Sequence, residues 1–306
     1  MQPLVSVICA TYRHKDFIGR CLEGILTQQT DFDFEVLVND DASTDGTVEI
    51  IKDYEARFPH RLRVVYQTEN QYSKGVEISL GILYPMARGK YIAECEGDDY
   101  WTDCDKLQKQ VDYMEAHPDC PMCYTRAAVY DQRREEFYHS HMGSPYQGYE
   151  ALLLNNPVPT MTCLFRRDIL QDYIRDIRPL EHHWATADYP KWLYFAHRAP
   201  LAFLDVCTGV YRDKSPASIS NPRQYATRLK FLQSIYVIRC FYADLYGFAD
   251  KLSAQILYEH ERYCIKEGIH YHDYPGALRE LKKATSPTCW DRLIFYIRIF
   301  WGKLFS

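Results

Sequence analysis

This chain of 306 residues lacks any long run of basic side chains. Its 36 lysines and arginines face 41 aspartates and glutamates, which gives a formal net charge of −5. Proteins that bind nucleic acid use many cations to neutralise phosphates, so nucleic acid is not expected as the main partner. Hydrophobic residues still make up 47% of the chain, enough for one large domain or for a domain with an appendage.

The amino terminus also lacks the long apolar segment of a secretory signal peptide. The apolar run between Pro3 and Ala10 is short and continues directly into Thr11 and Tyr12, so we expect a cytoplasmic protein. The eleven cysteines are odd in number and scattered, several of them inside apolar runs, which is typical of reduced, buried thiols. Cys120 and Cys123 form a lone CxxC pair, which does not by itself predict a zinc or redox site.

Short apolar runs alternate with helical patterns over the first hundred residues. The runs predict strands, and the patterns repeat apolar residues every three or four positions, as helices do. Strands are expected at 4–10, 34–38, 62–66 and from 91, with helices at 17–26, 48–58 and 76–87 between them. This alternation with short connections predicts the α/β class, with a mostly parallel, doubly wound sheet flanked by helices.

Acidic side chains cluster just after the strand that begins at Tyr91. Glu96, Asp98 and Asp99 are expected on the loop at that strand's carboxyl end, where open parallel sheets bind ligands. Carboxylates so close together raise one another's pKa unless a cation lies between them. Mg²⁺ or Mn²⁺, shared with substrate phosphates, is the natural counter-charge. The alternative is a solvated acidic turn that caps the helix beginning near Asp105.

A second acidic loop follows the strand at 34–38. Asp40 and Asp41 stand at its carboxyl end, ahead of Ser43, Thr44 and a helix. Their carboxylates offer acceptors for a nucleobase or a ribose. Alternatively, Ser43 or Thr44 caps the helix and the aspartates favour its dipole. Two acidic loops on successive strand ends of one sheet indicate a ligand site more strongly than either loop does alone.

Several short motifs occur in a fixed order over residues 5–110. They are Val5-Ser6-Val7-Ile8 with Thr11-Tyr12, then Val38-Asn39-Asp40-Asp41-Ala42-Ser43-Thr44-Asp45-Gly46-Thr47, then Gly89-Lys90-Tyr91-Ile92 leading to Glu96-Gly97-Asp98-Asp99-Tyr100-Trp101, and Lys106-Leu107-Gln108-Lys109-Gln110. In this order and spacing the motifs resemble those of a family 2 glycosyltransferase with the GT-A fold. The resemblance implies an inverting enzyme whose nucleotide-sugar donor lies across the carboxyl ends of the strands.

The resemblance implies a role for each residue of the second loop and of the first strand's end. Tyr12 would lie against the uracil ring of a UDP-sugar, since UDP is the family's common carrier. Asp41 would accept a hydrogen bond from the imide N–H, with Thr11 and Asp40 as neighbours. These four residues are the expected nucleotide contacts.

The resemblance also assigns the acids of the first loop. Asp99 would be the principal ligand of the Mn²⁺ or Mg²⁺ that bridges the diphosphate, and Asp98 would meet the ribose or the metal. Glu96 stands where the family usually has aspartate, so its role as a substrate contact departs from the pattern. The segment 69–75 also differs from the glycine-asparagine loop of many relatives, which bears on donor identity.

A third motif that could carry chemistry occupies residues 182–192. Asp188 precedes an aromatic helical segment and by itself predicts a helix N-cap. The resemblance makes Asp188 the catalytic base, which takes a proton from the acceptor hydroxyl while that oxygen attacks the anomeric carbon. It also makes Thr160 and Thr162 candidate acceptor contacts.

Two arginines remain as candidate phosphate contacts. Arg212, with the more remote Arg166, would bring positive charge to the diphosphate; the alternative for both is a structural ion pair.

We expect the GT-A catalytic domain at 1–214, its nucleotide-sugar half at 1–115 and its acceptor half at 116–214. Residues 215–306 are expected to form a helical appendage with helices at 223–246, 248–267 and 275–284, and with Gly247 and Gly268 as helix stops. The last helix, 290–305, is too short and too charged to span a bilayer. It either packs on the appendage or lies in the interface at the inner face of the membrane.

The favoured function is transfer of a sugar to a saccharide or lipid-linked acceptor, in surface polysaccharide or lipopolysaccharide synthesis. A nucleotidyltransferase shares the fold type, but its glycine-rich amino-terminal loop is missing from 10–14. A non-catalytic relative that acts as a binding partner in an assembly complex would keep the fold but would not carry the acidic residues of the site. Asp41, Asp98, Asp99 and Asp188 are all present, so this alternative is disfavoured.

Overall fold

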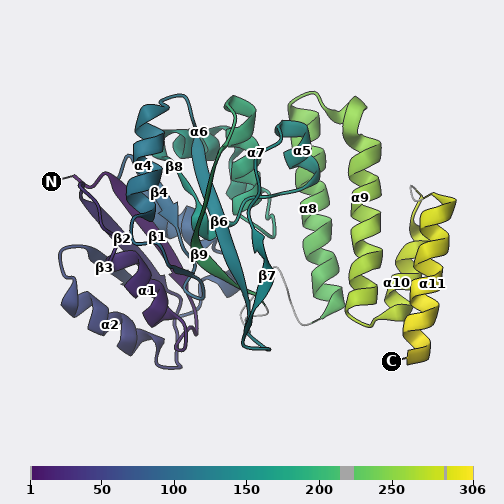
Figure 1. The fold of residues 1–306 in the computed structure, drawn as a ribbon, viewed down its shortest axis with the longest axis horizontal. Helices are drawn as coiled ribbons and strands as arrows, with labels where there is room; N and C mark the ends of the chain where they lie inside the picture. The colour runs from purple at the N-terminus through teal and green to yellow at the C-terminus, as the bar shows by residue number, and fades with distance from the viewer. Residues whose placement is uncertain (1, 214–223, 286–287, 306) are drawn as a thin grey trace. The chain divides into compact units, whose positions relative to one another are not determined.

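The computed structural model describes residues 2–213, 224–285 and 288–305 (Figure 1). The chain divides into two compact units. The first comprises Met1–Gly148, Pro157–His182 and Ala187–Ala217, and the second comprises Tyr149–Asn156, His183–Thr186 and Ser218–Ser306. The second unit therefore includes two short segments from the part of the chain expected to form the catalytic domain.

The first unit is built on a nine-stranded sheet whose amino-terminal part is parallel, in the order β3-β2-β1-β4. Every residue of β1 except Ala10 is buried, as expected for a strand covered on both faces. In the register of β1 and β2, Val5 pairs with Phe34 and Thr11 pairs with Asp40, so the two strands end level with each other. The four strands are β1 Val5–Thr11, β2 Phe34–Asp40, β3 Leu62–Tyr66 and β4 Tyr91–Glu94.

The rest of the sheet is mixed and continues in the order β8-β6-β9-β5, with β7 paired to β6. Antiparallel pairs join β4 to β8 and β6 to β8, whereas β6 and β9 are parallel. The predicted α/β class is confirmed. The strands are β5 Tyr100–Trp101, β6 Met122–Asp131, β7 Glu136–Met142, β8 Leu164–Arg166 and β9 Ala202–Asp213.

Helices cover the sheet of the first unit (Figure 1). On the first helix, Cys21, Leu22 and Ile25 are fully buried at helical spacing and pack on the strands. The helix at 167–177 was not predicted, although its apolar residues repeat at helical spacing. The helices are α1 Ile18–Leu26, α2 Thr47–Arg57, the π-helix Ser79–Leu83, α3 Tyr84–Met86, α4 Lys106–Ala116, α6 Arg167–Ile177 and α7 Asp188–Arg198.

The alternative interpretation of the second acidic loop, in which Ser43 or Thr44 caps α2, is wrong. Neither Ser43 nor Thr44 caps the helix, because the Ser43 hydroxyl accepts a hydrogen bond from the Arg13 N–H at 2.8 Å. The N-cap is Gly46, and the Asp45 carboxylate accepts from the backbone N–H and the hydroxyl of Thr47, the first residue of the helix, at 3.1 and 2.7 Å. Ser43 and Arg13 therefore tie the second acidic loop to the end of β1.

The second unit is helical. Helices α8, α9, α10 and α11 contact one another in sequence, and Gly247, with a φ of 75°, ends α8 as predicted (Figure 1). Gly268 was expected to end the next helix but lies inside α9, where a Cβ would stand 2.8 Å from the Ala277 Cβ; glycine is needed there for close packing of α10. The helices are α5 Tyr149–Leu154, α8 Tyr225–Leu245, α9 Ala249–His270, α10 Tyr274–Lys283 and α11 Cys289–Phe305. None of the helices in the described part of the chain combines the length and apolarity needed to cross a membrane.

Candidate active site

The two predicted acidic loops meet at the carboxyl ends of β1 and β2. The Asp41 N–H donates to the Thr11 carbonyl at 3.0 Å, and the Gly97 N–H donates to the Ala10 carbonyl at 3.1 Å. A Cβ at Gly97 would lie 2.7 Å from Thr11 Oγ1 and 2.8 Å from His14 Nδ1. Only glycine permits this approach, so Gly97 is what brings the loop of Glu96, Asp98 and Asp99 against the end of β1.

Asp99 is the deepest of the three acids in that loop. It is 3% exposed, its N–H donates to the Glu96 carbonyl at 3.0 Å, and its Oδ1 accepts from the Arg212 N–H at 2.8 Å. Burial, and then the charges of Asp98 and Glu96, raise the pKa of Asp99 well above its usual value, against a smaller lowering by Arg212. A deprotonated Asp99 therefore calls for further positive charge beside it.

Glu96 is shifted in the same direction. Its side chain is solvent-exposed, yet protein closely surrounds its carboxylate. That desolvation, followed by the charges of Asp98, Glu94 and Asp188, raises the pKa of Glu96 to about 8. Negative charge thus accumulates at this loop.

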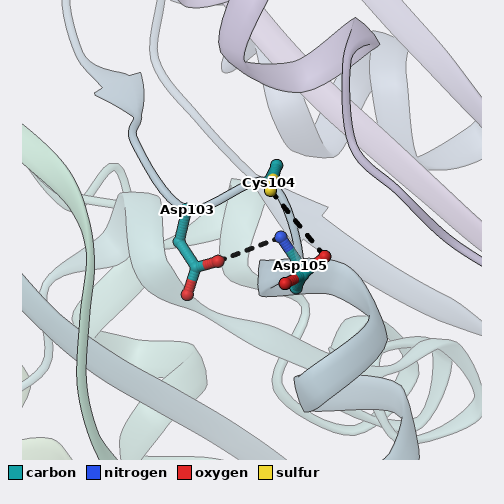
Figure 2. Close-up of side chains that lie close together, drawn as sticks. All are labelled: Asp103, Cys104 and Asp105. Carbon is teal, nitrogen blue, oxygen red and sulfur yellow. Dashed lines mark hydrogen bonds between the residues drawn. The ribbon is translucent and has the colours of Figure 1, made fainter.

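The donor set of the loop suits a hard cation, although its three carboxylates do not converge on one point. Among the described residues, the one group of three ligand atoms within 4.8 Å of one another is Asp103, Cys104 and Asp105 (Figure 2). That group is accounted for by the start of α4, because the Asp103 carboxylate accepts from the Asp105 N–H at 2.9 Å and pairs with Lys109 at 2.6 Å. A cation at the predicted loop would take one or two carboxylates and complete its shell with substrate oxygens, as Mg²⁺ commonly does.

The predicted nucleotide contacts surround the ends of β1 and β2. Tyr12 is 36% exposed, and the Arg13 guanidinium lies 5.3 Å from its ring centre. Asp41 is buried, and its two carboxylate oxygens accept from the backbone N–H groups of Gln71 and Tyr72 at 2.7 and 3.0 Å. Asp41 therefore fixes the segment 69–75, the one that departs from the family pattern, beside the predicted base site.

Four buried polar atoms at this edge have no hydrogen-bond partner within the described part of the chain. An unsatisfied buried polar group costs about 1–3 kcal/mol, so this is where the groups of a ligand or ordered water would be accommodated. The atoms are Thr11 Oγ1, His14 Nδ1, Asn39 Nδ2 and Asp40 Oδ1. Thr11 and Asp40 were predicted site residues, whereas His14 and Asn39 were missed.

His14 sits among acids. It is 7% exposed, and burial lowers its pKa while the charges of Asp98, Asp45 and Asp40 raise it by less. The only signal for His14 in the sequence is its position two residues after Tyr12, which did not separate it from a surface histidine.

Asp188 is brought to the same edge from α7. It is the first residue of the helix, after Ala187 at the N-cap, so the interpretation of Asp188 as the N-cap itself is wrong. Its Oδ2 accepts from the Thr160 hydroxyl, and its charge contributes to the raised pKa of Glu96. Thr162, in contrast, is fully buried and bonded to the Thr125 and Pro159 backbone, so it is not available to an acceptor.

The two predicted arginines differ in how their guanidinium groups are bonded. Arg166 donates to the Cys120 and Met114 carbonyls, both at 2.9 Å, at the end of α4. Arg212 is 8% exposed; its guanidinium donates to Gln132 at 3.0 Å and lies 4.9 Å from the ring centre of Tyr100. Arg166 is a structural cation, whereas Arg212 lies beside Asp99 and its buried Nε has no hydrogen-bond partner among the described residues.

A buried ion pair that the sequence did not predict lies beneath these residues. Lys191 Nζ is 2.6 Å from Glu94 Oε1, and the side chains are 2% and 8% exposed. The Tyr84 hydroxyl contacts both groups. Lys191 is one turn after Asp188 on α7, and Glu94 ends the strand that leads into the acidic loop. The pair thus joins the helix of Asp188 to the loop of Asp98 and Asp99.

Comparison with known proteins assigns the family. The family described as "Glycosyl transferase family 2" matches residues 6–174, more than half of the chain. An uncharacterized protein of Mycobacterium tuberculosis is 34% identical over 180 residues, which cover 58% of this chain but only 51% of that protein. TuaG of Bacillus subtilis, named as a teichuronic acid biosynthesis glycosyltransferase, is 28% identical over 76% of this chain and 87% of its own. WfaP of Escherichia coli, named as a UDP-Glc:alpha-D-GlcNAc-diphosphoundecaprenol beta-1,3-glucosyltransferase, is 36% identical over 37% of this chain and 41% of its own.

Two solved structures share the fold. TarS of S. aureus, in complex with UDP-GlcNAc, has a TM-score of 0.58 at 19% identity, over 87% of this chain and 81% of that one. The mannosyltransferase PcManGT of Pyrobaculum calidifontis, in complex with GDP-Man and Mn²⁺, also has a TM-score of 0.58 at 19% identity, over 97% and 79%. These similarities confirm the predicted GT-A fold. The chain belongs to glycosyl transferase family 2.

Proposed function

We propose that this chain transfers a sugar from a nucleotide-diphosphate donor, a UDP-sugar, to an acceptor hydroxyl with inversion at the anomeric carbon. The observation that carries the proposal is the close approach of Gly97 to Thr11 and His14. This approach joins the acidic loop to the ends of β1 and β2. The charge of Asp188, from the third motif at 182–192, contributes to the raised pKa of Glu96 at the same edge. In a parallel sheet this edge is where nucleotides bind.

The nucleotide is assigned to Thr11, Tyr12, Asp40 and Asp41. The exposed Tyr12 ring offers a stacking surface for uracil, and the unpartnered Thr11 Oγ1 and Asp40 Oδ1 offer hydrogen bonds. The Asp41 carboxylate keeps a free lone pair on each oxygen beside its two bonds to the 69–75 segment, so it can still accept from the imide N–H. The complex of TarS with UDP-GlcNAc and the UDP-Glc donor in the name of WfaP support UDP over the GDP of the PcManGT complex.

Asp99, together with Asp98, is assigned to hold Mn²⁺ or Mg²⁺, with Glu96 as a further substrate contact. The hard oxygen donors fit such an ion, and the raised pKa of Asp99 reports a carboxylate that lacks sufficient positive charge. When bound, the ion offsets the charge that grows on the departing diphosphate. The Mn²⁺ in the PcManGT complex supports a divalent metal in this role.

Asp188 is assigned as the base that removes the acceptor proton. The Thr160 hydroxyl donates to Asp188 Oδ2 and the Tyr189 N–H donates to Oδ1 at 2.7 Å, so both oxygens of the carboxylate are held in place. Each carboxylate oxygen can accept more than one hydrogen bond, which lets Asp188 also accept from the acceptor hydroxyl. That hydroxyl oxygen attacks the anomeric carbon as the bond to the diphosphate breaks, and its proton passes to Asp188. A single in-line displacement inverts the centre, so no side-chain nucleophile is required.

The acceptor is assigned to the saccharides and lipid-linked saccharides of surface polysaccharide or lipopolysaccharide assembly. The names of TuaG and WfaP support this assignment, because one refers to teichuronic acid and the other to a diphosphoundecaprenol acceptor. We assign the donor to residues 1–115 and the acceptor to 116–214, and we place the enzyme on the cytoplasmic side, at the inner face of the membrane.

Release of UDP from a panel of UDP-sugars tests this function. The full chain is incubated with each donor, Mn²⁺ and either free saccharides or diphosphoundecaprenol-linked saccharides. We expect acceptor-dependent UDP release from one donor, loss of that release in Asp188→Asn, and a product of inverted anomeric configuration by NMR. Tight UDP binding without turnover of any donor would favour the non-catalytic binding protein instead.

A further inference from the structure

Helix α11 is apolar on two opposite faces. Its inner face carries Phe295 and Ile299, each 3% exposed, which pack in a cluster with residues of α9 and α10 such as Ile265 and Leu281. Its outer face is apolar as well. Five of the thirteen exposed large hydrophobic side chains found in the described residues lie on this helix: Leu293, Ile294, Tyr296, Ile297 and Phe300, at 44–62% exposure.

The outer residues form one continuous stripe. At about 100° per residue, Leu293, Ile297 and Phe300 project opposite to the buried pair, with Tyr296 and Ile294 on either side. A helix that packs on a protein core normally presents polar residues on that outward face. The apolar stripe, defined as these five residues, therefore needs a partner that removes it from water.

Positive charge is concentrated around the stripe. Residues 279–305 contain six lysines and arginines but only two acids, although the whole chain carries a net charge of −5. Arg298 lies exposed beside Ile294 on the helix. Lys282 and Lys283 lie exposed at the end of α10, which contacts α11, and Lys283 also pairs with Glu280 at 3.1 Å. The surroundings of the stripe therefore suit an acidic partner.

We propose that the apolar stripe of α11 binds an anionic lipid bilayer, with the helix lying in the plane of the membrane interface. Exposed aromatic and aliphatic residues flanked by cations are the composition that stabilises an amphipathic helix at this depth. A second copy of the chain is the less favourable partner, because pairing two stripes would bring two sets of like charges together. The proposal rests on α10 and α11 alone and does not depend on the proposed transferase activity.

Sedimentation with vesicles tests the proposal. The full chain is mixed with vesicles of phosphatidylcholine alone and with vesicles that contain about one third phosphatidylglycerol, a fraction chosen to give a strongly negative surface. We expect binding to the anionic vesicles that weakens as salt is raised. The double substitution Ile297→Gln/Phe300→Gln is expected to lower the partition coefficient by at least about tenfold, since both side chains enter the acyl boundary.

The matched control is Phe137→Gln/Leu180→Gln, which removes two apolar side chains outside α11 whose exposure, 53% and 51%, is similar to the 47% and 62% of Ile297 and Phe300. This control is expected to bind like the parent, and Lys282→Glu/Lys283→Glu is expected to lose the preference for anionic lipid. Circular dichroism and the response of each variant to UDP separate a loss of lipid binding from a loss of fold or of the nucleotide site. Failure to bind either vesicle, equal binding by the stripe variant, or a dimer that only the stripe variant dissociates would overturn the proposal.

Discussion

Replacing Lys191 by methionine is expected to destabilise the first unit more than any surface substitution would. Lys191 and Glu94 form an ion pair at 2.6 Å with side chains only 2% and 8% exposed. Removing the cation leaves a buried carboxylate uncompensated, which costs about 3–5 kcal/mol. With a urea dependence of about 2–3 kcal/mol per molar, the unfolding midpoint should fall by roughly 1–2.5 M.

The double variant Lys191→Met/Glu94→Gln separates loss of charge balance from loss of packing. It removes both charges while keeping similar side-chain volumes, and replacement of a whole buried pair is often neutral. We expect it to recover most of the stability lost in the single variant. Urea unfolding, followed by the fluorescence of buried tryptophans such as Trp192 beside Lys191, measures the stability of the single and the double variant.

Two results would refute this reasoning. One is a single variant within about 1 kcal/mol of the parent, since an unpaired buried carboxylate is expected to cost several times that amount. The other is a double variant at least as unstable as Lys191→Met, because the cost would then come from packing or from Tyr84 rather than from the unpaired charge.

Three further predictions concern the proposed base Asp188, the close approach at Gly97 and the buried carboxylate of Glu35. Asp188→Asn should lower the transfer rate by about 10²–10⁴ while UDP affinity by calorimetry stays unchanged; unchanged turnover would exclude it as the base. Gly97→Ala should weaken UDP binding at least about tenfold, or 1.4 kcal/mol, because its Cβ would collide with Thr11 and His14; parental affinity would contradict the close approach. Burial alone would raise the pKa of Glu35, but hydrogen bonds from Arg88 and Ser6 lower it overall. The stabilisation that Glu35 provides is therefore present above the ordinary glutamate pKa and is lost as the pH falls through the lowered pKa. Glu35→Gln should be less stable than the parent near neutral pH and should lose less stability as the pH falls. A variant that loses as much stability in acid as the parent would argue against this role of Glu35.

The parallel part of the fold could be predicted from the sequence because its signals are local. Each of β1 to β4 is a short run rich in apolar residues, and the acids at the ends of β2 and β4 mark the strand ends at which they lie. The antiparallel pairing of β8 with β4 and β6 depends on contacts between distant segments, which no local pattern encodes.

The features that the sequence did not predict correctly have specific physical causes. Lys191 has the sequence signature of a solvated helix residue, and its burial depends on Glu94, which lies far away in the chain. Gly268 resembles a helix stop, but it serves close packing on Ala277. His14 becomes part of the site only because Gly97 brings the acidic loop against it. The roles of Tyr12, Asp41, Asp98, Asp99 and Asp188 stay predictions.

The most direct test of the nucleotide and metal site is the melting temperature of the full chain with a panel of nucleoside diphosphates, each with and without Mn²⁺. The parent is compared with Asp99→Asn, which keeps an acceptor for the Arg212 N–H but removes the charge. Ligands that bind only the folded state raise the melting temperature by mass action. We predict a Mn²⁺-dependent rise with UDP in the parent that is lost in Asp99→Asn. A chain that responds to no nucleotide, or a variant that responds like the parent, would contradict the account.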